Sequence, residues 1–422
     1  MKVFKFGGAS VKDAAAVKNV AKILEQYAND SVLVVVSAMG KTTNALENLA
    51  HAHYHNHVEK KQTLYKEIKN FHDEIISGLL DNTDTHAYHD IENLFIELEC
   101  LLEADCEGAY DYNYDQIVSY GEIFSTRIVS SYLNQVDVKN RWMDARNFIN
   151  TDATFRDARV DWALTETMIE RKLKPIVAKQ LVITQGFIGQ NKEHNTTTLG
   201  REGSDYSAAI FAYGLKADSV TIWKDVAGVM NGDPKKFPAA IKLDELSYTK
   251  AIEMAYYGAT VIHPKTIQPL KGKNIMLYVK SFLNPEAKGT VVSNHAHEQH
   301  IPSFISKGNQ TLISISSKDF SFIVEDNLVN IFKIFALHNV NINLMQNSAI
   351  SFSVCVDNKG EDLDKLKSEL SIHYNVRANE NVELLTIMNY SEEAIKEFTV
   401  GKPILLEQRT RATVQFVLKA NA

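Results

Sequence analysis

One run of apolar, β-branched residues constrains the fold of this chain more than any other feature. Residues 31–37 read Ser-Val-Leu-Val-Val-Val-Ser, which predicts a strand that is buried on both faces. A first strand over residues 3–6 and an alanine-rich helix over residues 11–27 precede it. Parallel neighbours need such a crossover connection, usually a helix. The sequence therefore predicts an α/β domain with a mostly parallel sheet sandwiched by helices.

The elements expected after this unit extend the same domain to residue 295. Residues 44–113 are rich in Leu, Glu, Lys, His and Asn, and they predict a helical insertion. Further helices are expected over residues 119–134, 157–171, 204–213 and 248–257, and shorter strands near residues 141–144, 174–184, 219–223 and 275–279. Such an alternation is typical of an α/β domain, which we place at residues 1–295.

The pattern changes beyond a polar connector. From residue 305 to residue 380 the expected order is strand, helix, strand, strand, helix, strand, with short strands over residues 310–316 and 374–377 at its two ends. This order is the split-βαβ unit of ferredoxin-like α+β domains. A second unit starts with a strand near residue 382, but the sequence ends before that unit is complete. We therefore expect one such domain over residues 305–380 and an abbreviated copy over residues 381–422.

Composition and charge exclude several classes of protein. The 422 residues include 52 Asp and Glu against 45 Lys and Arg, a net charge of −7, whereas a general nucleic-acid binder carries a basic surplus. The longest apolar runs fall far short of the ~18 residues of a membrane helix. The N-terminus has no signal-peptide pattern, and three scattered cysteines do not make a disulfide framework. We therefore expect a cytoplasmic protein that binds neither nucleic acid nor membrane.

Two loops with small residues follow the first two expected strands. In the first, Gly7, Gly8 and Ser10 would let backbone N–H groups approach an anion at a helix N-terminus, with Lys5 beside them as a point charge. A plain strand–helix turn with a solvated lysine explains this loop equally well. The second loop carries Thr43, whose hydroxyl would either hold a ligand carboxylate or cap the next helix.

Charged residues stand in later loops of the same kind. Glu122 ends an S-x-x-E segment, where it either closes a capping box or pairs with a substrate ammonium. The planar guanidinium of Arg201, in a glycine-rich loop, suits a carboxylate. Ser204 and Asp205 are natural helix caps, and Asp205 would alternatively orient Lys5 or a metal-bound phosphate.

Two further clusters are less specific. Lys224 and Asp225 follow an apolar strand at its carboxyl end, where open α/β sheets bind ligands, although a surface turn explains them as well. Alternate histidines occur over residues 51–57, but no cysteine or carboxylate joins them at the spacing of metal ligands. We interpret the histidine run as a solvated helical surface.

Three segments together resemble the aspartokinases of the amino acid kinase family. Residues 5–10 (Lys-Phe-Gly-Gly-Ala-Ser) are similar to the family's Lys-Phe-Gly-Gly-Thr-Ser. Residues 197–205 (Thr-Thr-Leu-Gly-Arg-Glu-Gly-Ser-Asp) and 257–264 (Tyr-Gly-Ala-Thr-Val-Ile-His-Pro) are similar to its Thr-Thr-Leu-Gly-Arg-Gly-Gly-Ser-Asp and Phe-Gly-Ala-Lys-Val-Leu-His-Pro. The C-terminal units resemble the family's paired ACT regulatory domains. The resemblance implies transfer of the ATP γ-phosphoryl group to the side-chain carboxylate of L-aspartate, the first step toward lysine, threonine and methionine.

The resemblance also implies a role for each candidate residue. Lys5 would neutralise the transferring phosphoryl group, and Asp205 would organise the lysines or the Mg²⁺ carried by ATP. Arg201 and Glu122 would bind the α-carboxylate and the ammonium of aspartate. The substrate-binding residues would be Thr43, Glu122, Arg201 and Ser204, and the nucleotide-binding residues Gly7, Gly8, Ser10, Lys224, Asp225, Met230, Lys235 and Thr260. A homodimer through the ACT domains is expected as well.

The chain departs from the family most clearly on the nucleotide side. Thr260 and Lys235 stand where the family has a lysine and an arginine, and Met230 replaces a tyrosine. Lys224 takes the place of a threonine next to Asp225. We hypothesise that Lys224 partly compensates for the cation that is missing at Thr260.

Departures near the substrate and in the regulatory half are smaller in number. Glu202 replaces a glycine next to Arg201. Lysine-sensing relatives have an aspartate in the first ACT domain that pairs with the effector ammonium, and Asn343 stands at that position here. An amide does not supply the countercharge, and burying an unpaired ammonium is costly. We therefore expect weak or absent feedback by lysine.

Two other functions stay open at this point. The first is another amino acid kinase, acting on glutamate or N-acetylglutamate, although the C-terminal units and the pair Glu122 and Arg201 favour a free α-amino acid. The second is a catalytically inactive amino-acid sensor of the same fold. Intact Lys5, Arg201 and Asp205 argue against such a sensor.

Overall fold

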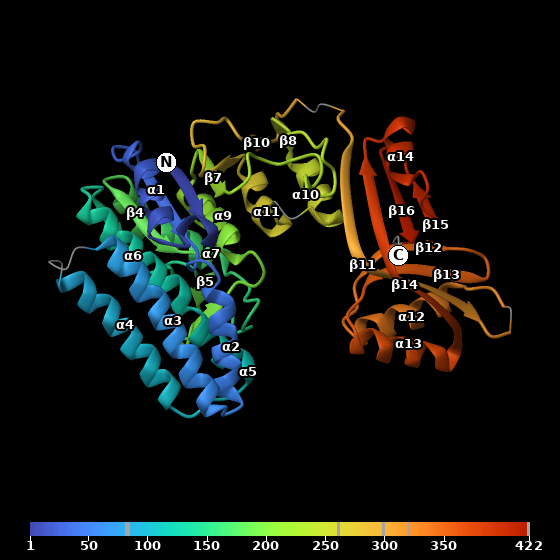
Figure 1. The fold of residues 1–422 in the computed structure, drawn as a ribbon, viewed down its shortest axis with the longest axis horizontal. Helices are drawn as coiled ribbons and strands as arrows, with labels where there is room; N and C mark the ends of the chain where they lie inside the picture. The colour runs from blue at the N-terminus through green and yellow to red at the C-terminus, as the bar shows by residue number, and fades with distance from the viewer. Residues whose placement is uncertain (81–84, 260–261, 298–299, 320, 420–422) are drawn as a thin grey trace. The chain divides into compact units, whose positions relative to one another are not determined.

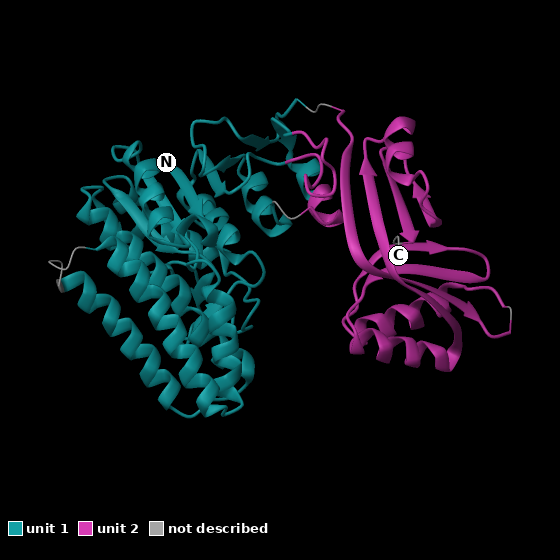
Figure 2. Cartoon of the chain, in the orientation of Figure 1, with its two compact units in different colours: residues 1–229, 242–252, 261–298 teal, residues 230–241, 253–260, 299–422 magenta. Residues whose placement is uncertain are grey.

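Two compact units make up the chain (Figure 1, Figure 2). The computed structural model describes all residues except 81–84, 260–261, 298–299, 320 and 420–422. Unit 1 comprises residues 1–229, 242–252 and 261–298, and unit 2 comprises residues 230–241, 253–260 and 299–422. Each unit has a β-sheet of its own.

Unit 1 is built on an eight-stranded sheet with the order β3-β4-β2-β1-β7-β9-β10-β8. Its strands are β1 (Lys2–Phe6), β2 (Val32–Val36), β3 (Asn140–Trp142), β4 (Leu181–Gln185), β7 (Ser219–Lys224), β8 (Glu245–Ser247), β9 (Met276–Ser281) and β10 (Thr290–Ser293). Every neighbouring pair is parallel except β9 with β10. The apolar run forms β2, which is buried at all its positions between β1 and β4. The mostly parallel α/β sheet is thereby confirmed.

Helices pack against this sheet, for example α6 against β3 and β4, and α9 against β1 and β7 (Figure 1). The helices of unit 1 are α1 (Ala14–Glu25), α2 (Thr42–Tyr54), α3 (Val58–Leu79), α4 (Thr85–Glu103), α5 (Tyr110–Val118), α6 (Tyr120–Gln135), α7 (Trp162–Met168), α8 (Lys174–Val177), α9 (Gly203–Leu215) and α11 (Pro264–Gly272). Helix α10 (Tyr248–Tyr257) runs from unit 1 into unit 2. Helices α2 to α5 occupy the stretch for which the sequence predicts a helical insertion.

One predicted strand begins too early. Residues 174–177 form α8, and β4 starts only at Leu181. Pro175 stands in the first turn of α8, where a missing N–H costs nothing. In a buried parallel strand the same proline would remove a ladder hydrogen bond, so the strand prediction over residues 174–184 is wrong in its first half.

The order of the central strands brings distant loops together. Because β4, β2, β1 and β7 are parallel neighbours, their carboxyl ends meet at one edge of the sheet. The loops that begin at Gly7, Ser37, Gly186 and Asp225 leave from that edge. After β4, a separate hairpin of β5 (Ile188–Gln190) and β6 (Thr196–Thr198) leads into the N-terminus of α9.

Unit 2 is built on a six-stranded antiparallel sheet with the order β12-β13-β11-β14-β16-β15. Its strands are β11 (Ser303–Ser317), β12 (Ile342–Asn347), β13 (Ser351–Asp357), β14 (Tyr374–Met388), β15 (Ile404–Arg409) and β16 (Thr413–Lys419), and its further helices are α12 (Glu325–Leu337), α13 (Glu361–His373) and α14 (Glu392–Thr399). The α+β character expected of the C-terminal part is confirmed.

Two long strands run through the whole sheet of unit 2. The sequence predicts short strands over residues 310–316 and 374–377 and another near 382, but β11 and β14 are continuous and pair along their length. Their register shifts between Lys307 and Leu312, where Asn309 has a φ of 53°. The bulge bends the strands without ending them, so the expected boundary at residues 380–381 falls inside β14.

Candidate active site

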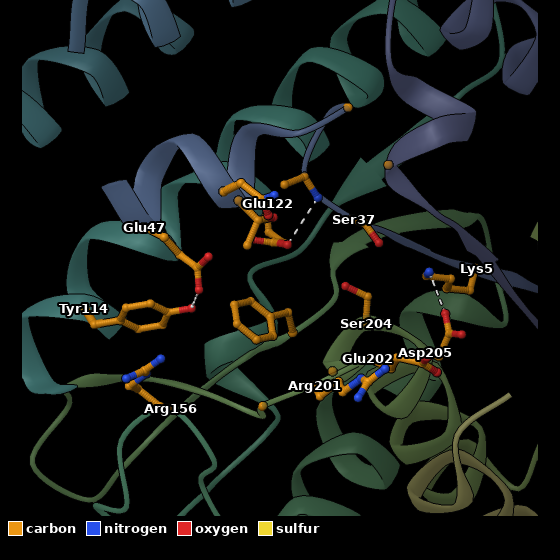
Figure 3. A pocket seen from close by; sticks show the side chains of 18 of the residues that line it. Lys5, Ser37, Glu47, Tyr114, Glu122, Arg156, Arg201, Glu202, Ser204 and Asp205 are labelled. Atoms are coloured by element: carbon orange, nitrogen blue, oxygen red, sulfur yellow. Dashed lines mark hydrogen bonds and ion pairs between the residues drawn. The ribbon is translucent and has the colours of Figure 1, made fainter. Parts of the chain in front are cut away.

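A cavity of about 550 Å³ opens at the carboxyl edge of the sheet of unit 1 (Figure 3). Predicted site residues that line it are Lys5, Gly8, Thr43, Glu122, Arg201, Ser204, Asp205 and Lys224. They come from β1 and the turn after it, from α2, from α6, from the loop before α9 and its first turn, and from the end of β7. The lysine near the start of the chain and the arginine two hundred residues later therefore share one cavity.

Two lysines share the buried carboxylate of Asp205. Lys5 Nζ lies 2.5 Å from Oδ1 of Asp205, and Lys224 Nζ lies 3.4 Å from Oδ2. Burial alone would raise the pKa of Asp205, but the two ammonium groups hold it below its usual range. Asp205 therefore stays ionised and keeps both lysines at the N-terminus of α9, where an anion is favoured.

Glu122 presents an unpartnered carboxylate oxygen inside the cavity. Its side chain is buried, Oε1 accepts a hydrogen bond from the N–H of Ala38 (3.2 Å), and Oε2 has no hydrogen-bond partner. The alternative capping box is absent, because the hydroxyl of Ser119 donates to the carbonyl of Gln116. Burial raises the pKa of Glu122 to about 8, although the N–H of Ala38 and the charge of Lys5 act against this shift. A bound ammonium would satisfy Oε2.

The loops around these groups need residues of small size. A Cβ atom on Gly8 would lie 2.8 Å from the carbonyl oxygen of Ala38 and 2.9 Å from that of Gly40. On Gly186 it would lie 2.5 Å from Cβ of Ser204. The backbone thus approaches the cavity closely at both loops. Thr43 lines the cavity and caps no helix, since the N-cap position of α2 is Lys41.

The loop before α9 carries Arg201 and Glu202. Arg201 is exposed at the rim of the cavity. Glu202 adopts a left-handed conformation, with a φ of 53°, and its Oε2 is buried without a hydrogen-bond partner. Nothing in the structure explains why a glutamate stands at this position.

Several lining residues have no counterpart in the sequence-based prediction. Glu47, Tyr114 and Arg156 form one side of the cavity, opposite the pair Lys5 and Asp205 (Figure 3). The hydroxyl of Tyr114 donates to Oε1 of Glu47 over 2.6 Å. These residues lie on α2, on α5 and in the turn before α7, so no motif connects them in the sequence.

Other predicted residues do not line the cavity. Gly7 and Ser10 lie in the loop after β1, where a Cβ atom on Gly7 would be 3.3 Å from Nζ of Lys5, and the buried hydroxyl of Ser10 has no partner. Asp225 directly follows β7. Met230 and Lys235 belong to unit 2, and Thr260 lies outside the described residues.

The histidine run is compatible with its interpretation as a surface feature. His51, His55 and His57 are exposed and His53 is buried. Within the described part of the chain, no group of three His, Cys, Asp or Glu side chains is placed to hold a metal ion. None of the helices in that part is long and apolar enough to span a membrane.

The burial of Glu122 predicts a pH-dependent stability of the ligand-free protein. The pKa of Glu122 near 8 in the folded protein lies above its value in the unfolded chain, so the folded state binds the proton more tightly. The contribution of this proton to the free energy of unfolding is complete below about pH 4.5 and is lost as the pH rises to about 8. Glu122→Gln should therefore raise the free energy of unfolding by about 2–4 kcal/mol at pH 8 and by little near pH 5. Urea unfolding at both pH values measures this difference. Glu193→Gln, at an exposed position, is the control, and equal stabilities at pH 8 would contradict the prediction.

Comparisons with known proteins identify the family of this chain. Residues 1–281 match the amino acid kinase family. Lysine-sensitive aspartokinase 3 of Escherichia coli is 34% identical over 416 residues, which are 95% of this chain and 89% of that protein. The structure of E. coli aspartokinase III in complex with lysine and aspartate has a TM-score of 0.83, and the complex with aspartate and ADP has 0.82, each at 31% identity over 99% of this chain and 96% of that one. The chain belongs to the aspartokinases of the amino acid kinase family.

Proposed function

We propose that this protein transfers the γ-phosphoryl group of ATP to the side-chain carboxylate of L-aspartate, which gives 4-phospho-L-aspartate and ADP. The observation that carries the proposal is that one cavity holds both cations for a phosphoryl group and side chains for the charged groups of an amino acid. Lys5 and Lys224 offer positive charge for a phosphoryl group, whereas Glu122 and Arg201 fit the ammonium and the α-carboxylate of an amino acid. The E. coli relative is described in complex with aspartate and ADP, which supports both substrates.

The geometry supports a direct transfer between the two substrates. Glu122 Oε2 would receive the substrate ammonium and Arg201 the α-carboxylate, with the hydroxyls of Thr43 and Ser204 as donors to the carboxylates. The side-chain carboxylate of aspartate is already ionised at neutral pH, so no general base is needed. One of its oxygens forms a bond to the γ-phosphorus while the bond between that phosphorus and the oxygen of ADP breaks.

Lys5 and Lys224 would stabilise the charge that is shared by the three oxygens of the moving phosphoryl group. Asp205 does not touch the phosphoryl group in this proposal; it holds both lysines in place. We propose that Mg²⁺ is held mainly by the ATP phosphates. Such an ion would supply further charge neutralisation, with Asp205 as the carboxylate on that side of the cavity.

We also propose that Gly7, Gly8 and Ser10 contact the ATP phosphates. Their loop links β1 to the first helix, and the buried Ser10 hydroxyl is available as a donor. The proposed nucleotide-binding set further includes Lys224, Asp225, Met230, Lys235 and Thr260. A cytoplasmic location and a place at the start of lysine, threonine and methionine synthesis are part of the same proposal.

Acyl phosphate formation, trapped with hydroxylamine in the presence of aspartate, ATP and Mg²⁺, tests this function. Lys5→Ala should lower kcat by about 100-fold or more, because one preorganised stabiliser of the transition state is lost. Lys2→Ala on the same strand is the matched control, since Lys2 is outside the cavity and forms an exposed ion pair with Asp30 and a cation–π contact with Tyr27. Aspartate binding without ADP release from the wild type would identify an inactive sensor instead. A kcat within a fewfold of wild type for Lys5→Ala would remove Lys5 from its role.

Lys224 is expected to act on the nucleotide. Its ammonium shares Asp205 with Lys5, so it lies where ATP phosphates would arrive. Lys224→Ala should raise the KM for ATP and lower kcat, each by about tenfold, and Lys224→Arg should retain much of the activity because the charge is kept. Initial rates at varied ATP measure both constants. Unchanged constants in Lys224→Ala would show that Lys224 does not compensate for the cation missing at Thr260.

The hydrogen bonds of Asn343 in unit 2 support the prediction that lysine inhibits this protein weakly or not at all. Asn343 Nδ2 donates to Gln310 (2.8 Å) and to Asp357 (3.0 Å), and its Oδ1 accepts from the ammonium of Lys307 (3.0 Å). A protein ammonium therefore already occupies the acceptor of Asn343. Activity should remain close to its full value at low-millimolar lysine, measured as ADP release at subsaturating aspartate. A sharp fall in activity over this range would contradict the prediction.

A homodimer through the C-terminal unit is the remaining part of the proposal. Strand β12 is an edge of the sheet, and Met345 on it is half exposed. Helix α12 leaves Val329 and Phe332 exposed as well. Sedimentation equilibrium should give twice the mass of the chain, and Met345→Lys with Phe332→Glu should shift the equilibrium toward monomer. A monomeric wild type at micromolar concentration would refute the dimer.

A further inference from the structure

Asp115, a buried carboxylate outside the predicted site, joins three segments beside the cavity. It lies in α5 with no exposed surface. Its oxygens accept hydrogen bonds from the N–H of Thr198 (2.8 Å), from the hydroxyl of Thr198 (2.7 Å) and from the N–H of Arg156 (3.2 and 3.1 Å to the two oxygens). Asp115 on α5 thus holds both β6 and the turn before α7.

This junction lies directly behind Arg201. Thr198 is the last residue of β6 and precedes Arg201 by three positions. The N–H of Ala158 donates to the carbonyl of Thr198 (2.9 Å), which links the turn to the strand a second time. A Cβ atom on Gly200 would overlap with the carboxylate of Asp157, so the same turn packs against the residue next to Arg201. The position of Arg201 therefore depends on contacts that Asp115 organises.

The same carboxylate fixes the backbone of Arg156. This residue has a φ of 67°, which is unfavourable for a side chain with a Cβ atom and persists only when its surroundings hold it. The guanidinium lines the cavity, 4.5 Å from the centre of the Tyr114 ring. Its ion pair with Asp111 (3.3 Å) joins two half-exposed side chains and contributes little. The guanidinium is therefore available to a ligand carboxylate.

The charge of Asp115 strengthens this arrangement. Burial raises the pKa of Asp115 to about 6, although the donors on Thr198 and Arg156 act against the shift. The carboxylate is therefore ionised at neutral pH, and hydrogen bonds to an ionised acceptor are stronger than neutral ones. Gln116, the next residue of α5, exchanges two hydrogen bonds with the backbone of Thr196 (2.9 and 3.2 Å), so α5 holds β6 over most of its length.

We propose that Asp115 is a positioning residue for the amino-acid end of the cavity. It fixes Arg201 through Thr198 and directs Arg156 into the cavity as a second cation for a carboxylate of bound aspartate. Figure 3 shows Arg156 and Tyr114 on the side of the cavity opposite the pair Lys5 and Asp205, so the effect falls on aspartate rather than on ATP. This inference rests on the proposed aspartate kinase function.

Asp115→Asn tests the positioning role. The amide keeps the size of the side chain but turns one acceptor into a donor that faces N–H groups. The KM for aspartate should rise about tenfold or more, while the KM for ATP and kcat at saturating aspartate stay within about twofold. Thr198→Val removes one donor and should give an intermediate rise, and Thr198→Ser should restore the wild-type KM. This pair carries the test if Asp115→Asn does not fold.

Arg156→Gly separates the guanidinium from the backbone. Glycine adopts a φ of 67° without strain, so the turn is kept while the cation is removed. The KM for aspartate should rise about five- to tenfold with kcat nearly unchanged. Asp111→Asn is the control, because it breaks only the exposed ion pair of Arg156 and should leave all constants within about twofold.

Calorimetry of aspartate binding, measured together with the rates, distinguishes a failure of the positioning role of Asp115 from a failure of the proposed kinase activity. Weaker binding in Asp115→Asn and Arg156→Gly supports the inference whether or not the wild type turns over. Unchanged aspartate affinity in both variants overturns it, as does an equal loss in the KM for ATP and in kcat, which would indicate a merely structural role. A wild type that binds aspartate without releasing ADP refutes only the proposed activity, and one that does not bind aspartate refutes both.

Discussion

The order of three strands sets the electrostatics of the site. β1 lies between β2 and β7, with Lys5 opposite Ile222, so Lys224 stands two residues farther along the neighbouring strand. Both lysines therefore reach the first turn of α9, where Asp205 is buried between them. A carboxylate buried there alone would cost several kcal/mol, and the two cations compensate for that cost. The sheet order, more than any single loop, decides where positive charge is available to a phosphoryl group.

Two acidic side chains of the same cavity lack hydrogen-bond partners in the ligand-free protein. Glu122 and Glu202 each have a buried carboxylate oxygen without a hydrogen-bond partner, and Glu202 also has a left-handed backbone conformation. Such groups destabilise the ligand-free protein, and a substrate that carries an ammonium relieves the penalty at Glu122. The site is thus preorganised for a ligand with charges of both signs at the expense of stability.

Much of the fold could be predicted from the sequence, and the features that were not predicted have physical causes. The apolar run of β2 was enough to predict the sheet, whereas the group of side chains around Lys5 and Asp205 was predicted through the resemblance to the aspartokinases. Spacing did not separate caps from ligand-binding groups at Thr43 and Glu122, because the choice depends on which neighbour the side chain reaches. Asp115 and Arg156 lie about forty residues apart and belong to no motif, so only the folded chain joins them. The continuity of β11 and β14 was missed because a bulge resembles a break in a pattern of alternating residues.

The sequence predicts a separate C-terminal part, but no pattern in it shows that residues 230–241 and 253–260 belong to the same unit. Residues 230–241 belong to unit 2, where Phe237 packs against Phe304 and Phe398, with ring centres 5.4 and 5.0 Å away. Asn231 accepts a hydrogen bond from the N–H of Phe304 (2.6 Å) and donates one to the carbonyl of Pro302 (2.8 Å). The loop that carries Met230 and Lys235 is therefore held by the C-terminal sheet.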